Sequence, residues 1–390
     1  MQNIYGWMAS LMCGVLCAQS ALADINGGGA TLPLPLYQTA GVLPAGFAPY
    51  LGARSGGDKA AFLNNDYTQF VFGVTNKNVH WVASDSKLTS RELSTYASTR
   101  EPAWGKLIQV PSMGTSVAIP FNKSGTAAVD LSVNELCGVF SGRITDWSGI
   151  TGSGRAGAIK LVYRSESSGT TELFTRFLNA KCAETGTFNV TTTFNTSYTG
   201  GLPTGAVSAT GSQGAMTALA DTDGGITYMS PAFAAPTLAG LDDATKVARV
   251  GKNVATNTQG VSPAASNISD AIKAVPLPAV ANRGNPDVWV PVFGEPDMPY
   301  PTSGYPILGF TNLIFSQCYA DTVQTSQVRD FFTKHYGARA SINNDTAIAA
   351  NAFVPLPPNW KLAIRTSFLT ATNALSIGNT NVCNGIGRPL

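Results

Sequence analysis

The chain has 390 residues, of which only 12% are charged, and its net charge at neutral pH is +2. This charged fraction is about half the usual share, whereas the hydrophobic share of 44% is ordinary and excludes a disordered chain. No basic tract gives an electrostatic reason to expect nucleic acid as a partner. The length allows one large domain or two of ordinary size. A charged ligand would therefore have to be held with few charged side chains.

The first 23 residues have the pattern of a secretion signal. They contain no Lys, Arg, Asp or Glu, and residues 7–18 form an apolar run that is shorter than the roughly 20 residues needed to span a bilayer. Ala21 and Ala23 then place small side chains at the two positions that a signal peptidase reads. The sequence predicts cleavage after Ala23 and export to the periplasm or beyond.

Four of the six cysteines follow this signal: Cys137, Cys182, Cys318 and Cys383. An even number of cysteines in an exported protein indicates two disulfides, for which three pairings are possible. The pairs nearest in sequence, Cys137–Cys182 and Cys318–Cys383, close loops of moderate length. Because no two cysteines form a C-x-x-C half-site, we expect no metal site.

Strand-like and helix-like segments alternate along the chain, which predicts α/β architecture. In chain order, the pattern predicts strands at 79–83, 106–111 and 117–121, a helix at 133–140, a strand at 160–164, a helix with Leu173, Phe174, Phe177 and Leu178 on its apolar face, strands at 224–229 and 307–315, and helices at 325–336 and 359–369. Residues 231–305 are rich in Pro, Ala, Asn and Gly, so long surface loops around short elements are expected there.

The strongest candidate for a binding site begins where a predicted strand ends at Arg164. Ser168-Gly169-Thr170 then opens a helix, so that free N–H groups, hydroxyls and the positive end of the helix dipole converge. Gly169 lets a ligand approach the backbone closely, and Arg164 can bind an anion through two parallel hydrogen bonds. Glu166 is placed to pair with Arg164 and fix its guanidinium. The alternative interpretation of this segment is an ordinary capped helix.

Three further segments offer small polar groups for an anion. Thr31 follows three glycines, Ser55 precedes two glycines, and Asp85 ends the predicted strand at 79–83. An ionised carboxylate accepts hydrogen bonds but donates none. Asp85 would therefore hold an oxyanion that carries its own proton and repel a fully ionised one. The alternative role of Asp85 is to cap a helix over residues 87–97.

Two other patterns suggest chemistry that their context does not support. Residues 152–157 fit the G-x-G-x-x-G pattern of dinucleotide sites, but a strand rather than a helix is predicted after them. His80 and His335 are the only histidines, which leaves little for a zinc site or a Ser-His-Asp triad. His80 lies in an apolar strand, where a buried structural role is expected.

Several motifs together resemble one protein family. The chain is similar to the periplasmic phosphate-binding component of bacterial phosphate ABC transporters, and its predicted mature start, at residues 24–29, resembles the DING subfamily. The motifs that carry the resemblance, in chain order, are Gly29-Ala30-Thr31-Leu32, Ser84-Asp85, the segment 140–147, Arg164-x-Glu166-x-Ser168-Gly169-Thr170, the segment 211–214 and the segment 225–228.

The resemblance implies two α/β lobes of the type II periplasmic-binding-protein fold, joined by a two-stranded hinge, with the ligand in the cleft between them. Lobe one would comprise residues 24–115 and 300–390, and lobe two residues 116–299, so that each sequence-adjacent disulfide falls within one lobe. The implied phosphate-binding residues are Thr31, Leu32, Ser55 and Asp85 from lobe one and Arg164, Ser168, Gly169 and Thr170 from lobe two. Leu32 stands where the family often has Phe, so its contribution would be the backbone amide.

The function that the resemblance implies is high-affinity binding of inorganic phosphate, both monobasic and dibasic, in the cleft between the lobes, selective against sulfate, for uptake or scavenging. It implies no catalysis, no cofactor and a monomer, with phosphate as partner and the permease of a phosphate ABC transporter as a further candidate. One alternative is a secreted phosphomonoesterase, although the sequence offers no evident nucleophile with a base. Another is an extracellular interaction protein in which phosphate binding is secondary.

Overall fold

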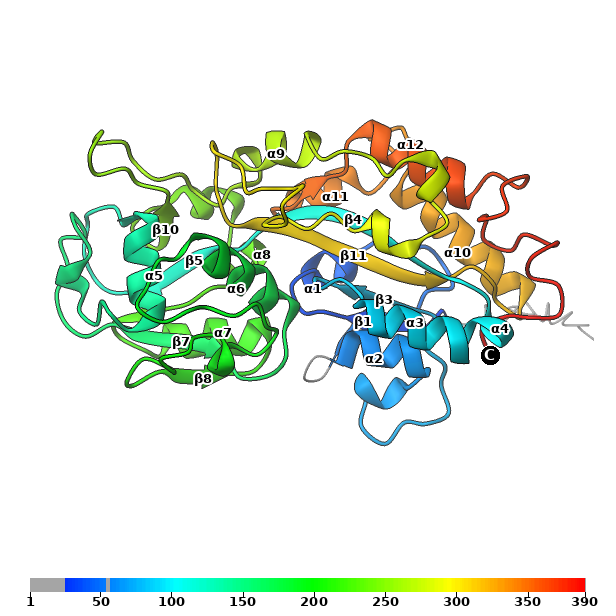
Figure 1. Ribbon diagram of the computed structural model, residues 1–390, viewed down its shortest axis with the longest axis horizontal. Coiled ribbons are helices and arrows are strands. Elements are labelled where there is room, and N and C mark those ends of the chain that lie inside the picture. Colours follow the sequence, from blue (N-terminus) through cyan, green and yellow to red (C-terminus); the bar gives the residue numbers. More distant parts are fainter. Residues whose placement is uncertain (1–24, 54–56, 390) are drawn as a thin grey trace, which may run out of the picture.

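The computed structural model describes residues 25–53 and 57–389, which form two six-stranded sheets (Figure 1). The predicted cleavage site and Ser55 lie outside the described residues. The first sheet has the order β12-β4-β11-β3-β1-β2, with strands β1 (Gly27–Gly29), β2 (Leu51–Gly52), β3 (Trp81–Ser84), β4 (Leu107–Ser116), β11 (Leu308–Ser316) and β12 (Val354–Pro355). The second has the order β6-β10-β5-β9-β7-β8, with strands β5 (Ile119–Asn122), β6 (Asp130–Leu131), β7 (Lys160–Arg164), β8 (Val207–Ala209), β9 (Gly225–Ile226) and β10 (Val247–Val250).

Helices cover both sheets, which gives the predicted two-lobed α/β architecture. Those of the first lobe are α1 (Leu34–Gln38), α2 (Gly57–Asn64), α3 (Ser90–Thr99), α4 (Glu101–Trp104), α10 (Thr322–His335), α11 (Asp345–Ala350) and α12 (Pro358–Phe368). The second lobe has α5 (Val133–Ser141), α6 (Gly169–Lys181), α7 (Gly211–Ala220) and α8 (Pro231–Ala234), and α9 (Ser269–Lys273) follows β10 in the sequence. Figure 1 shows α2 and α3 on one face of the first sheet and α10 and α12 on the other. None of the helices in the described ranges is long and apolar enough to cross a membrane.

The lobes meet where β4 runs directly into β5. The Val117 N–H donates to the carbonyl of Ile307, which precedes β11, and the Ala118 N–H donates to Met229 in the second lobe, each at 2.9 Å. A boundary at residue 299 assigns the segment 275–289 to the second lobe, but its contacts are with α12 of the first. There Trp289 packs against Trp360 at a centroid distance of 6.2 Å, and Trp360 Nε1 donates to the Val275 carbonyl. The predicted lobe boundaries, with residues 24–115 and 300–390 in lobe one and residues 116–299 in lobe two, therefore remain a prediction.

Two local differences from the predicted elements have a physical cause. The strand predicted at residues 106–111 ends at Pro111, whereas β4 continues to Ser116. A register shift in β11 between Thr311 and Asn312 accommodates the proline, which has no N–H to donate to the ladder. The segment 231–305 contains short helices as expected, and also β10, which lies inside the second sheet between β6 and β5.

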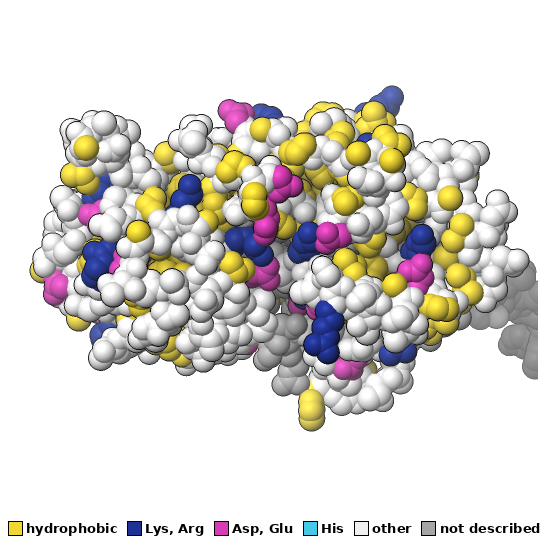
Figure 2. Space-filling view, in the orientation of Figure 1, with side chains coloured by type: hydrophobic (Ala, Val, Ile, Leu, Met, Phe, Trp, Pro, Cys, Tyr) yellow, Lys and Arg dark blue, Asp and Glu magenta, His cyan; other side chains and the backbone are white. Residues whose placement is uncertain are grey.

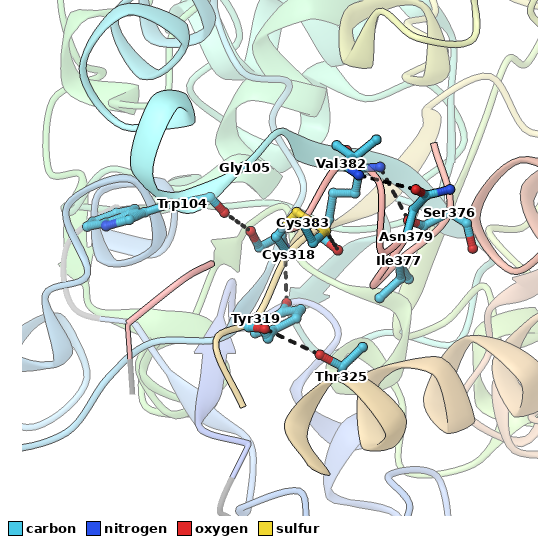
Figure 3. Close-up of a disulfide and its surroundings, with 12 residues drawn as sticks. Trp104, Gly105, Cys318, Tyr319, Thr325, Ser376, Ile377, Asn379, Val382 and Cys383 are labelled. Atoms are coloured by element: carbon cyan, nitrogen blue, oxygen red, sulfur yellow. Dashed lines mark hydrogen bonds between the residues drawn. A yellow bond between two sulfur atoms is a disulfide. The ribbon is translucent and has the colours of Figure 1, made fainter. Parts of the chain in front are cut away.

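Both predicted disulfides are present, Cys137–Cys182 and Cys318–Cys383, and each joins segments of one lobe. Figure 3 shows the second of them, which attaches the C-terminal segment to the end of β11. Gly105 packs against it so closely that a Cβ atom there would lie 2.7 Å from the Cys318 sulfur, and its φ of +79° also favours glycine. By limiting the unfolded chain, a bridge of this span stabilises the fold by about 2–4 kcal/mol.

Candidate functional site

In both sheets, the carboxyl ends of parallel strands lie toward the region between the lobes. Strands β1 and β3 pair in parallel in the first sheet, as do β7 and β8 in the second, so the segments after these strands meet between the lobes. Open α/β sheets bind ligands at the carboxyl ends of their strands. The cavity there is lined by Gly29, Ala30, Thr31, Ala53, Asp58, Asp85, Arg164, Glu166, Ser167, Ser168 and Gly169.

The cavity is small, with about 20 Å³ open to the centre of a water-sized atom. Its residues come from both lobes, so a ligand held there touches both. A cavity of this size favours a small ligand over a large one. The larger hollows of the first lobe lie beside α3, away from these strand ends.

Arg164 supplies the positive charge of the cavity, and Glu166 holds it in place. The Arg164 Nε donates to Glu166 Oε1 at 2.5 Å, and Nη2 of the same guanidinium pairs with that oxygen. The Gly211 N–H, at the start of α7, donates to Glu166 Oε1 at 2.9 Å. Arg164 and Glu166 are both buried, with side chains 5% and 7% exposed, so the guanidinium is fixed before any ligand arrives.

Arg164 makes one further hydrogen bond across the interface between the lobes and one within its own lobe. Its Nη2 donates to the Thr31 hydroxyl of the first lobe at 3.2 Å, and its Nη1 donates to Ser212 at 3.4 Å. Thr31 Oγ1 and Ser212 Oγ lie 3.0 Å apart. These three side chains form one polar cluster at the cavity, and Ser212 is a member that the motif-based prediction did not assign.

Asp85 is the carboxyl group that faces this cluster from the first lobe. Its Oδ1 accepts from the Thr311 hydroxyl of β11 at 2.6 Å, while its buried Oδ2 has no hydrogen-bond partner among the described residues. Burial raises the pKa of Asp85 to about 7, with the Thr311 hydroxyl acting in the opposite direction. The helix after β3 begins at Ser90 and is capped by Thr89, so Asp85 does not cap it. Its free oxygen is available to accept a hydrogen from a ligand.

The helix that directs its N-terminus into the cavity is α6. Ser168 caps α6 by accepting from the Thr171 N–H at 3.4 Å, and Gly169, the first residue of α6, lines the cavity. The first N–H groups of a helix lack partners within the helix, and the helix dipole gives that end a partial positive charge. At α7, the N–H groups of Gly211 and Ser212 already donate to Glu166 and Thr31. Neutral groups of α6 thereby add to the attraction that Arg164 exerts on an anion.

The structure brings together most of the residues that the motifs predicted. Thr31, Asp85, Arg164, Ser168 and Gly169 line the cavity, and Glu166 holds Arg164 as expected. Leu32 and Thr170 are buried beside it without lining it, and the Leu32 carbonyl accepts from Ser230 of the second lobe at 3.1 Å.

Gly169 is a point of close approach between the two lobes at the cavity. A Cβ atom at this position would lie 2.7 Å from Asp85 Cβ and 3.0 Å from its Cα, across the interface. We expect Gly169→Ala to prevent full closure and to raise the Kd for phosphate at least about a hundredfold, because the donors of the two lobes no longer converge. Titration calorimetry with small-angle scattering checks both effects.

The matched control for this change is Gly214→Ala within α7, because no atom lies within 4 Å of a Cβ atom there. Gly214→Ala should bind as tightly as the wild type. Equal phosphate affinity of Gly169→Ala and wild type would contradict the close approach.

The other candidate patterns have structural roles. Arg155, within the G-x-G-x-x-G pattern, donates to the carbonyls of Lys123, Ala127, Ser153 and Gly125 and so fastens surrounding loops. His80 is buried, and its Nδ1 accepts from the Asn26 N–H at 2.9 Å. Within residues 25–53 and 57–389, no group of three or more His, Cys, Asp or Glu side chains could hold a metal ion.

Comparisons with known proteins agree with this geometry. A family model described as a PBP superfamily domain matches residues 24–331. A protein named "Phosphate-binding protein", from an unknown prokaryotic organism, is 71% identical over 94% of this chain and 100% of its own length. A protein of Pseudomonas aeruginosa strain UCBPP-PA14 named alkaline phosphatase L is 66% identical over 98% of each chain.

The solved structures include that of a high-affinity periplasmic phosphate-binding protein (PfluDING) bound with phosphate. It is 79% identical and superposes with a TM-score of 0.92, covering 94% of this chain and 100% of that one. Identity of this extent over the whole described fold settles the family. The chain belongs to the PBP superfamily, within its group of DING-type phosphate-binding proteins.

Proposed function

We propose that this protein binds inorganic phosphate with high affinity between its lobes, after export and removal of residues 1–23. The observation that carries the proposal is the opposition of Arg164 and Asp85 across one small cavity. Arg164 and the helix amides attract the anion, and Asp85 accepts a hydrogen that phosphate carries and sulfate lacks. The proposed ligands are Thr31, Leu32, Ser55, Asp85, Arg164, Ser168, Gly169 and Thr170.

The attraction is local rather than a property of the whole surface. Figure 2 shows charged side chains of both signs scattered among uncharged ones on this face. With a net charge of +2, long-range steering contributes little, and the cavity itself has to provide both affinity and selectivity. We propose that the periplasmic or secreted protein acts as a monomer, in phosphate uptake through a transporter permease or in scavenging.

Titration calorimetry of the mature protein tests the proposed function. We expect one phosphate per chain and little heat with sulfate at the same concentration. A protein that binds no phosphate across the pH range where it stays folded would contradict the proposal.

A second function has one observation in its favour, the name alkaline phosphatase L of a relative that is 66% identical. A cavity that holds a phosphoryl group could also stabilise its transfer. Hydrolysis of a chromogenic phosphate ester that persists on repeated purification and is lost in Arg164→Ala would favour an enzyme. Activity that separates from the protein, or survives in Arg164→Ala, would leave binding as the function.

A further inference from the structure

The cavity contains a second carboxyl group opposite Arg164, which the motifs did not predict. Asp58 lies in the first turn of α2, the helix that follows β2 in the sequence, and the residue is 6% exposed. It lines the same cavity as Asp85. Gly57, before it, packs against Gln69 so closely that a Cβ atom would lie 2.4 Å from Oε1, which fixes how α2 enters the site.

The cation nearest in sequence to Asp58 is Lys59, whose charge and backbone N–H act against the burial that raises the pKa of Asp58. Lys59 Nζ donates to Glu92 Oε2 and to the Lys87 carbonyl, each at 3.1 Å. From β3, the Ser84 hydroxyl hydrogen-bonds to Asp58 and favours its ionised form. The other titratable groups that interact with Asp58 or line its cavity are Tyr50, Asp85, Arg164 and Glu166. Glu172, on α6, adds a further negative charge that acts on Asp85.

Charge in the cavity is therefore unbalanced when every carboxyl group is ionised. Arg164 contributes one positive charge, whereas Asp58, Asp85 and Glu166 contribute three negative ones, and Arg164 is already paired with Glu166. Burial raises the pKa of Asp58 and of Asp85, and the charge of Asp58 raises the pKa of Asp85 further. An incoming anion adds to the negative charge, so protons must accompany it.

We infer that Asp58 and Asp85 act as a pair of hydrogen-accepting carboxyl groups, so that the complex with phosphate holds two protons between ligand and pair. Monobasic phosphate carries both protons itself and donates one to each carboxylate. Dibasic phosphate carries one, and the second is taken from solvent and resides on one of the two carboxyl groups. The inference rests on the proposed function, because it concerns the same cavity.

The consequence is a dependence of affinity on pH that Asp85 alone would not produce. Above neutral pH, where free phosphate is mainly dibasic, the second proton of the complex is taken up from solvent on binding. One proton taken up on binding lowers the affinity by about tenfold for each unit that the pH rises. A site with a single carboxylate accepts dibasic phosphate without this uptake.

Titration calorimetry with phosphate between about pH 7 and about pH 9, in two buffers that differ in ionisation enthalpy, measures the protons taken up. For the wild type we expect uptake approaching one proton at the alkaline end and a Kd that rises about tenfold per pH unit. For Asp58→Asn we expect uptake near zero, a flat Kd over this range, and tighter binding than the wild type at the alkaline end. Asp270→Asn, which removes a fully exposed carboxylate, should behave as the wild type.

The outcomes separate this inference from the proposed function. If the wild type binds phosphate but takes up no proton, or if Asp58→Asn keeps the same pH dependence, the paired role of Asp58 is wrong while phosphate binding stands. If the wild type binds no phosphate at any pH, the proposed function itself fails. Because the proton count of the wild type needs no variant, the test remains decisive should Asp58→Asn fold poorly.

Discussion

Replacing Arg164 with Ala should raise the Kd for phosphate by about a hundredfold to a thousandfold. The guanidinium is the positive charge of the cavity, and its removal leaves Glu166 as a buried carboxylate without its partner. Losing a buried, charge-assisted contact with the ligand costs about 2–5 kcal/mol of binding free energy, and each 1.4 kcal/mol is about tenfold in affinity. Titration calorimetry at neutral pH measures the loss.

Two comparisons distinguish the lost ligand contact from a general disturbance. In Arg164→Ala combined with Glu166→Gln, the uncompensated charge is gone, so thermal stability should recover while phosphate affinity stays low. Arg143→Ala removes the partner of another buried glutamate of the same lobe, Glu184, at 2.8 Å and away from the cavity. Binding by Arg164→Ala equal to that of Arg143→Ala would contradict the assigned role of Arg164.

Asp85→Asn should reduce the preference for phosphate over sulfate at least about a hundredfold, because a site built around one hydrogen-bond pattern rejects a ligand that cannot complete it. The carboxylate accepts a hydrogen that phosphate supplies, whereas the asparagine amide also donates one to a ligand oxygen that has no hydrogen. Phosphate affinity should fall and sulfate affinity should rise, which competition titrations measure. An unchanged ratio of the two affinities would show that Asp85 does not read the protons of the ligand.

Asp85→Asn should also change how the free energy of unfolding depends on pH, in a direction that the pKa of Asp85 fixes. Burial raises the pKa of Asp85 from 3.8 to about 7, so the folded state binds its proton more strongly than the unfolded state between these values. In the ligand-free wild type, this contribution to the free energy of unfolding therefore decreases as the pH rises through that window. Asp85→Asn should lose less stability than the wild type between about pH 5 and about pH 8, which urea unfolding without phosphate measures. Asp270→Asn should match the wild type.

Local sequence patterns predicted the elements that carry their own signals. The strand at 160–164 and the helix with Phe174 and Phe177 on its apolar face are where the periodicity placed them. The strand through Pro111 was predicted too short, because β4 continues past the proline by pairing with β11, where Asn312 lies opposite Pro111 and Ser112 is left without a partner in the register. Three-residue β8 and four-residue β10 are too short to show periodicity.

The candidate site was predictable as far as its motifs extend. Arg164, Glu166 and Ser168 lie within one strand-to-helix turn, and that spacing alone suggested an anion site. Ser212 and Asp58 belong to other turns, and they become members only because parallel strands bring their carboxyl ends to one edge. The segment Gly56-Gly57-Asp58 before a helix was a signal for Asp58, but nothing local shows that it faces Asp85 across a cavity.

Arg164 lies on the second lobe, whereas Asp58 and Asp85 lie on the first. An anion would therefore bind to the positive charge before it contacts the two carboxyl groups. We propose that an open molecule offers Arg164 and the N-terminus of α6 on one lobe, which attract any small oxyanion regardless of its hydrogens, and that the carboxylates of the other lobe reach the ligand only on closure. Phosphate and sulfate should therefore enter at similar rates, and rejection of sulfate should be expressed in how briefly it stays. The protein would discriminate between the two anions through their dissociation rates. The second lobe would bind either anion first, and the carboxylates of the first lobe would then stabilise only the one that carries a hydrogen.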